Sequence, residues 1–407
     1  MKIVHKGANY WKTFDNGDTE WPALQHSLST HVLIIGGGMS GLLTALLLHQ
    51  HNIDFVLVEA GELAGGSSSA STGLLQYSND IMLYELRQQI GKEQADYYYR
   101  CCYDALQQLK TLIKSIEEDV GGLQYQARSS LQLSTTTEDI AKLQQEYEAL
   151  SSIGLPCELW DSEQLSQYFP FSRPNALVTH HDAEINPHLF VIKSAQYLMK
   201  HGQQLYEHSA VTGLSKLNSG RYRADINGVA IDAATVVHAV GYQYQQLQQL
   251  QLQLLLARSY VIVTEPIENL DFWYERMLIW ETARPYFYTR ITDDNRIIIG
   301  GLDEPTSDIN WDQASVSEHS EKLLSYLQQL FPELDTRIAY QWNATFIETR
   351  DGLPYIGAHP QDPTQYFVLG YGGNGVVSSM LGAQYVADAI IGQQSLQPLG
   401  TILGLAR

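Results

Sequence analysis

The chain has 407 residues, of which 44% are hydrophobic and 17% charged, and its formal net charge is −20. This composition excludes a disordered chain, and so acidic a chain has no overall field to attract nucleic acid or an anionic membrane. The three cysteines, Cys101, Cys102 and Cys157, have neither disulfide-framework nor zinc-site spacing. There is no apolar signal core and no apolar run of about 18 residues, so we expect a cytoplasmic protein without a membrane span.

The N-terminal segment differs in composition from the rest of the chain. Residues 1–30 are polar, and we expect an irregular arm that Trp11 and Trp21 anchor on the body.

At about 150 residues per domain, the length predicts two or three domains.

The first regular pattern is a βαβ unit. Residues 31–35 are a continuous apolar run typical of a buried parallel strand, 42–51 consist of helix formers, and 53–60 form a second apolar run. The unit predicts a parallel sheet near the start of the chain.

A G-x-G-x-x-G motif lies between the first strand and the helix. Gly36 permits the tight turn, Gly38 lets a pyrophosphate approach the backbone, and Gly41 lets helix and strand pack closely. The N–H groups of the helix N-terminus hold the anion, and Glu59, at the end of the second strand, is placed to bind ribose hydroxyls. In this context the motif predicts dinucleotide binding rather than an unrelated glycine-rich turn.

The remaining chain alternates between helical and strand patterns. Helical periodicity predicts helices at 80–118, 137–152, 188–201, 314–330 and 376–391. Strands are expected at 123–134, 204–207, 210–217, 235–242, 258–266, 340–347 and 366–369, with hairpin turns at Asn227-Gly228 and at Thr292–Asn295. Residues 173–190 contain turn residues, including Asn186-Pro187, and the Gln-rich stretch 243–253 is interpreted as an amphipathic helix or a loop.

A stretch of Gly and Ser at 64–75 indicates which dinucleotide binds. Directly after a ribose-binding glutamate, such a loop offers N–H and hydroxyl donors over a long ligand; the alternative is a flexible surface loop. Two later segments belong with it: Thr349-x-Asp351-Gly352-x-Pro354-x-Ile356-Gly357, and Gly370-Tyr371-Gly372-Gly373-Asn374-Gly375 before the last predicted helix. Together these motifs resemble the FAD-binding family of D-amino-acid oxidase, glycine oxidase and sarcosine oxidase. His238-Ala239-Val240-Gly241 is similar to a late strand of that family, with Val240 where the family usually has threonine.

The resemblance implies a set of cofactor contacts and a fold. Besides Gly36, Gly38, Gly41 and Glu59, it implies FAD contacts at Met39, Ser40, Ala60, Gly66, Ser67, Ser68, Thr72, Gly73, Leu74, Val211, Gly241, Gly372, Gly373, Asn374, Gly375 and Val376. The implied fold class is α/β (α+β overall): a Rossmann-like FAD-binding domain with an inserted antiparallel-sheet substrate domain. We expect the former to comprise 31–121, 182–241 and 342–407, and the latter 122–181 and 242–341.

Candidate substrate-pocket residues come from two predicted strands. Tyr286, Tyr288 and Arg290 share one face of a strand, which is either a half-buried aromatic face or the wall of the pocket. The resemblance places Phe346 where glycine and D-amino-acid oxidases carry an arginine for the substrate carboxylate. This implies an amine rather than a simple α-amino acid, unless Arg258, Arg284 or Arg290 replaces the lost charge.

The resemblance thus implies an FAD-dependent oxidoreductase that dehydrogenates a C–N bond of a small amine or amino acid. Hydride would pass to flavin N5, the imine would hydrolyse, and oxygen or another acceptor would reoxidise the flavin. The alternatives are oxidation of a C–O bond of a hydroxy acid with a non-oxygen acceptor, and a non-catalytic flavoprotein subunit. No catalytic acid or base is assigned.

Two further expectations concern metals and flavin attachment. His180-His181-x-x-Glu184 has no third ligand at sensible spacing, so we expect no metal site there. Some sarcosine oxidases tether the flavin through a cysteine, at a position that corresponds here to Ala344, so we expect non-covalent FAD.

Overall fold

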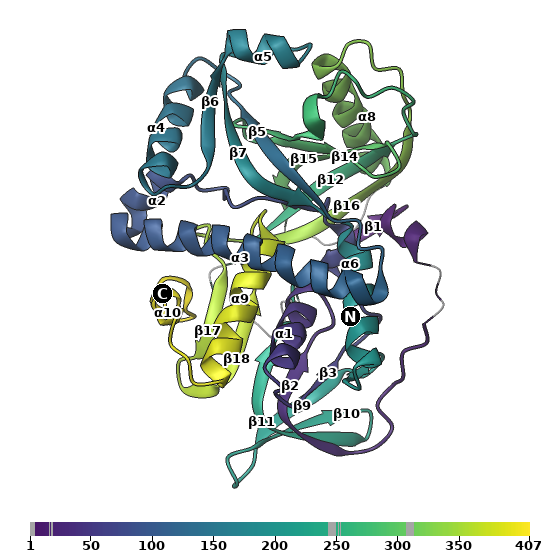
Figure 1. The fold of residues 1–407 in the computed structure, drawn as a ribbon. Coiled ribbons are helices and arrows are strands. Elements are labelled where there is room, and N and C mark those ends of the chain that lie inside the picture. Colours follow the sequence, from purple (N-terminus) through teal and green to yellow (C-terminus); the bar gives the residue numbers. More distant parts are fainter. Residues whose placement is uncertain are drawn as a thin grey trace.

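Two sheets organise the computed structural model, which describes residues 5–15, 17, 19–242, 250, 252, 254–306 and 313–407 (Figure 1). Within these residues the smaller sheet has eight strands: β17 (Tyr355–His359), β18 (Asp362–Leu369), β11 (Val229–His238), β2 (Leu28–Ile35), β3 (Phe55–Val58) and β8 (Gln204–Tyr206), with β9 (Val211–Lys216) and β10 (Tyr222–Ile226) attached through β11. Strands β18, β11, β2, β3 and β8 run parallel. The predicted βαβ unit lies at the centre of this sheet.

Both faces of the smaller sheet are covered, which explains its continuous apolar strands. Val32 and Ile34 of β2 pack in a cluster with helices α1 (Met39–Gln50), α3 (Lys92–Val120), α6 (Pro187–Lys200) and α9 (Gly375–Ile390). Leu33 and Ile35 pack on the other face against apolar residues of β10 and β11. Figure 1 shows α1, α3 and α9 together on one side of this sheet.

The larger sheet has ten strands within the described residues. They are β1 (His5–Gly7), β16 (Ile338–Thr349), β12 (Leu254–Thr264), β15 (Ile297–Pro305), β14 (Phe287–Ile291), β13 (Leu278–Glu281), β5 (Gln126–Leu133), β7 (Asn175–Glu184) and β4 (Leu74–Leu75), with β6 (Cys157–Asp161) beside β7. Helix α8 (Gln313–Leu330) packs on β12, β15 and β16. Helices α4 (Asp139–Ser152) and α5 (Ser162–Tyr168) pack near β6 and β7, and α2 (Leu83–Ile90) and α10 (Gln397–Leu403) complete the fold.

The N-terminal arm joins the larger sheet. Strand β1 pairs antiparallel with β16, with His5 opposite Ala344. Tyr10 and Trp11 are buried, and the Trp11 indole donates to the carbonyl of Ser71 at 2.7 Å. The arm is therefore anchored at Trp11, while Trp21 is partly buried against the main core.

Several elements differ from the sequence prediction. The predicted helix 80–118 divides at Gly91, whose φ of +88° ends α2 before α3 begins. The stretch 173–190, in which the sequence shows turn residues and predicts no strand, contains the ten-residue strand β7, which pairs with β5 and β6. The polar run His180-His181-Asp182 interrupts the apolar pattern that would predict a strand. Asp182 is nevertheless buried, because its carboxylate accepts hydrogen bonds from the Thr179 hydroxyl and the Tyr77 N–H.

The predicted domain division remains a prediction. Two strands of the larger sheet cross predicted domain boundaries. Strand β7 crosses the boundary at residue 182, and β16 crosses the boundary at residue 342. Residues 243–249, 251 and 253 of the Gln-rich stretch lie outside the described residues. Across the described part of the chain, no helix is both long and apolar enough to cross a membrane.

Candidate active site

A cavity of about 550 Å³ is lined by residues of both sheets and of the loops between them. One part of its lining comes from the β2–α1 turn, the end of β3 and the loop before α9. Another part comes from β12, β15 and β16 and from Trp280, Tyr286 and Tyr288. The site lies where segments far apart in the sequence meet.

The β2–α1 turn lines one part of the cavity. Gly36 has φ +116°, and a Cβ there would lie 2.2 Å from the Ala239 carbonyl oxygen. A Cβ on Gly41 would lie 1.9 Å from the Gly36 carbonyl, so Gly41 serves close packing and lies outside the cavity lining. Gly38 lines the cavity opposite the Ser68 hydroxyl, which accepts from the Met39 N–H at 3.0 Å.

The Glu59 carboxylate connects the β2–α1 turn to the loop after β3. Its two carboxylate oxygens accept from the N–H groups of Gly37 at 2.7 Å and Gly61 at 2.8 Å. Each oxygen keeps a further lone pair, so the carboxylate can also accept from ligand hydroxyls. Ala60 and Val211 line the cavity beside it.

The Gly/Ser segment is an ordered part of the site, built around the 3-10 helix η2 (Ser67–Ala70). Gly66, Ser67, Ser68, Thr72 and Leu74 line the cavity. Gly73 faces away from it; with φ +77°, a Cβ there would lie 2.1 Å from the Ile185 carbonyl oxygen.

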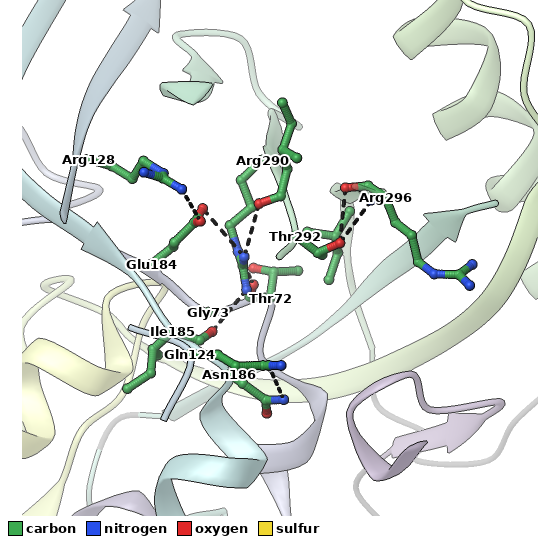
Figure 2. Close-up of polar contacts among 12 residues, drawn as sticks. Thr72, Gly73, Gln124, Arg128, Glu184, Ile185, Asn186, Arg290, Thr292 and Arg296 are labelled. Carbon is green, nitrogen blue, oxygen red and sulfur yellow. Dashed lines mark hydrogen bonds and ion pairs between the residues drawn. The ribbon is translucent and has the colours of Figure 1, made fainter. Parts of the chain in front are cut away.

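A buried arginine holds this segment in place, as Figure 2 shows. Arg290 donates to the carbonyls of Thr72 at 2.8 Å and Ile185 at 2.9 Å, and its Nη1 lies 3.5 Å from Glu184. Arg128 binds the other oxygen of Glu184 at 2.8 Å. The Arg290 guanidinium thus has its partners at the junction of the sheet and the η2 segment, and it does not line the cavity.

The loop before α9 is tied to the segment after β4. Asn374 donates to the Gln76 carbonyl at 2.6 Å, and the Gly373 N–H donates to Asp80 at 3.0 Å. Asp80 also accepts from the Tyr286 hydroxyl at 3.1 Å, so one carboxylate links this loop to the larger sheet. Gly372, Gly373, Asn374, Gly375 and Val376 all line the cavity.

Aromatic side chains form the wall contributed by the larger sheet. Tyr286, Tyr288 and Phe346 line the cavity together with Trp280. The Tyr286 and Tyr288 rings lie 5.5 Å apart, and the Tyr288 hydroxyl is 3.0 Å from that of Ser259. Tyr288 lies opposite Gly300 on β15, where a Cβ would come within 2.5 Å of its ring.

The fixed charge of the cavity is negative. Among the described residues that line it, Glu59, Asp80 and Asp303 are carboxylates, and there is no arginine or lysine. Arg258 donates to Thr306, and Arg284 donates to the Asp80 carbonyl with its guanidinium over the Tyr286 ring. Neither lines the cavity.

Sequence reasoning missed part of the site. It did not select Asp80, Ser259, Trp280 or Asp303, because no motif marks them and long-range pairing brings them together. It did weigh the His180 region, where His180 pairs with Glu158 and Ser129 on the exposed side of β7.

The chain is similar to known proteins over nearly its whole length. A family model described as FAD dependent oxidoreductase (DAO) matches residues 31–389. Gamma-glutamylputrescine oxidoreductase of Escherichia coli K12 is 25% identical over 397 residues, which are 95% of this chain and 89% of that protein.

Solved structures share the fold. A crystal structure of glycine oxidase from Geobacillus kaustophilus superimposes with a TM-score of 0.77 at 21% identity, covering 91% of this chain and 96% of that chain. L-proline dehydrogenase from P. horikoshii superimposes with a TM-score of 0.76 at 18% identity, covering 92% and 96%.

Proposed function

The chain belongs to the DAO family of FAD-dependent oxidoreductases, and from this premise we propose that it dehydrogenates the C–N bond of a small amine. The observation that carries the proposal is the character of the cavity: an aromatic wall, carboxylates, and no arginine or lysine among the described residues that line it.

The cavity fits the family's cofactor. Gly36 lets the turn pack against Ala239, and Gly38 lines the cavity at the start of α1. The first N–H groups of α1 have no carbonyl partner within the helix and suit a pyrophosphate. Glu59 is positioned for ribose hydroxyls, and the start of α9 brings a second helix N-terminus to the same cavity. We infer that these residues, with Ser67, Ser68 and Val211, hold FAD.

The chemistry divides between cofactor and protein. When bound, FAD would supply at N5 an acceptor for the hydride of the C–H bond beside the amine nitrogen, whose lone pair would form the C=N bond. The protein orients the substrate between Tyr286, Tyr288, Trp280 and Phe346 and keeps water from the reacting carbon. The imine would then hydrolyse in water, and oxygen or another acceptor would take the electron pair removed from the substrate.

An amine suits this cavity better than a simple α-amino acid. A buried carboxylate needs a cationic partner, and Phe346 offers an apolar or cation–π wall worth about 0.5–2 kcal/mol to an ammonium or alkyl group. None of the three arginines that could replace this cationic partner lines the cavity. Arg290 donates to the Thr72 carbonyl and lies beside Glu184, and Arg258 and Arg284 lie outside the cavity lining. The name of the Escherichia coli relative, gamma-glutamylputrescine oxidoreductase, also indicates an amine substrate, whereas glycine oxidase is named for an amino acid.

Anaerobic bleaching of the purified yellow protein tests the proposal. Alkyl amines and diamines should bleach the flavin rapidly, and glycine, D-alanine and hydroxy acids should do so slowly. Fastest bleaching by hydroxy acids would indicate C–O oxidation. If dithionite reduces the flavin but no substrate does, the protein is a non-catalytic flavoprotein. Oxygen consumption during turnover identifies the acceptor.

A further inference from the structure

An irregularity in β15 directs Asp303 into the cavity. In the regular part of the strand, Ile297 and Ile299 face the core under α8, and Ile298 faces the cluster around Val261 and Trp342. This alternation would turn residue 303 toward the α8 core.

A β-bulge reverses the alternation. Between the pairs Tyr260–Gly301 and Arg258–Glu304, two residues of β15 oppose one residue of β12. Leu302 has φ +58° and packs against the α8 core, so Asp303 turns to the cavity beside Ser259. Bulges occur next to active sites, where they re-aim a side chain.

The surroundings leave Asp303 short of partners. Its Oδ1 is buried and has no hydrogen-bond partner. Burial raises the pKa of Asp303 to about 6, Asp80 and Glu348 add to the rise, and a hydrogen bond from Ser259 and the charge of Arg284 oppose it. The charged groups near this part of the cavity are therefore the carboxylates of Asp303, Asp80 and Glu348 and the guanidinium of Arg284. The net charge there is negative, and the neighbouring walls are aromatic.

We propose that Asp303 binds a second cationic group of the substrate, so that the enzyme selects diamines or longer polyamines over monoamines. This inference rests on the proposed function. The reacting nitrogen must be neutral, because an ammonium has no lone pair to form the C=N bond. The positive charge that a carboxylate in this cavity recognises must then lie on another nitrogen. Aromatic walls favour the same group through cation–π contacts.

The test compares matched substrates on the holoenzyme. Diamines of three to six carbons are assayed beside the monoamine and the amino alcohol of equal length. In the unaltered protein, kcat/KM for the best diamine should exceed that of its monoamine roughly 10- to 100-fold, the usual cost of losing a charged hydrogen bond. D303N should bring the ratio close to one, chiefly through KM of the diamine, and Asp303→Glu should restore part of it.

Glu304→Gln is the matched control. It removes the same charge from the neighbouring residue, whose carboxylate faces away from the cavity and accepts from the Tyr260 hydroxyl. It should leave the diamine-to-monoamine ratio unchanged. Equal losses for diamine and monoamine in D303N would overturn the proposal, because Asp303 would then act on the reacting amine or on the fold.

Failure of the proposed function has a different signature. If no amine bleaches the flavin, calorimetric titration of the holoprotein with 1,4-diaminobutane still tests Asp303. Binding that D303N abolishes and Glu304→Gln retains supports the cation site, and absence of binding to the unaltered protein overturns it.

Discussion

Asp303 sets how substrate preference should change with pH. Burial raises its pKa to about 6, so the side chain is charged above that pH and neutral below it. The ratio of kcat/KM for diamine to monoamine should rise between about pH 5 and about pH 7 and then level off. Bound cation will move the midpoint downward. In D303N the ratio should stay flat over this range, and a wild-type ratio that falls between about pH 5 and about pH 7 would contradict this assignment.

Arg290 links the segment after η2 to the larger sheet through its bonds to Thr72 and Ile185. Arg290→Met removes the hydrogen bonds to Thr72 and Ile185 and leaves buried Glu184 with Arg128 alone. Breaking such a pair costs about 3–5 kcal/mol. We expect a loss of that order in the unfolding free energy, measured with denaturant, and weaker FAD retention after gel filtration.

A double variant separates charge from packing. Adding Glu184→Gln to Arg290→Met removes the uncompensated carboxylate, so the double variant should be more stable than the sum of the single effects predicts. Strict additivity would mean that the two side chains do not act as a pair.

At the scale of elements, the β14–β15 hairpin shapes the aromatic wall. The Tyr288 ring lies over Gly300, where an added Cβ would be 2.5 Å away. Gly300→Ala should displace the ring and cost about 1–3 kcal/mol through overpacking. The combination Gly300→Ala with Tyr288→Leu should recover most of this stability, but it should oxidise amines more slowly than the unaltered protein. Thermal unfolding and flavin-bleaching rates measure the two effects.

The elements also show what sequence patterns can and cannot reveal. The βαβ unit was predictable, because apolar runs and Gly36, Gly38 and Gly41 express local requirements of one turn. Strand β7 was missed, because its polar residues take partners that are distant in the sequence: the Tyr77 N–H donates to Asp182, and His180 pairs with Glu158 and Ser129. The bulge at Leu302 was missed for the same kind of reason: in the sequence, Gly300-Gly301-Leu302-Asp303 reads as the end of a hairpin strand, and only pairing with β12 reveals the extra residue.

For the molecule as a whole, the flavin is expected to be non-covalent. The resemblance to sarcosine oxidases places Ala344 where some of them tether the flavin through a cysteine, and Ala344 lines the cavity. No cysteine lines the cavity among the residues that the structure describes. Acid or heat precipitation should therefore leave the yellow colour in the supernatant, whereas colour in the pellet would indicate a covalent link.

The pairing of β1 with β16 has a consequence for the time course of synthesis. His5 emerges from the ribosome long before its partner Ala344, and β2 and β11 likewise wait for β18. The larger sheet is completed only after translation has passed residue 349, and the smaller sheet only after it has passed residue 369. Folding of both sheets therefore ends late, and pairing over such distances is slow. Until then the strands of the βαβ unit lack their β11 and β18 neighbours, and unpaired apolar strands of this kind are prone to aggregation.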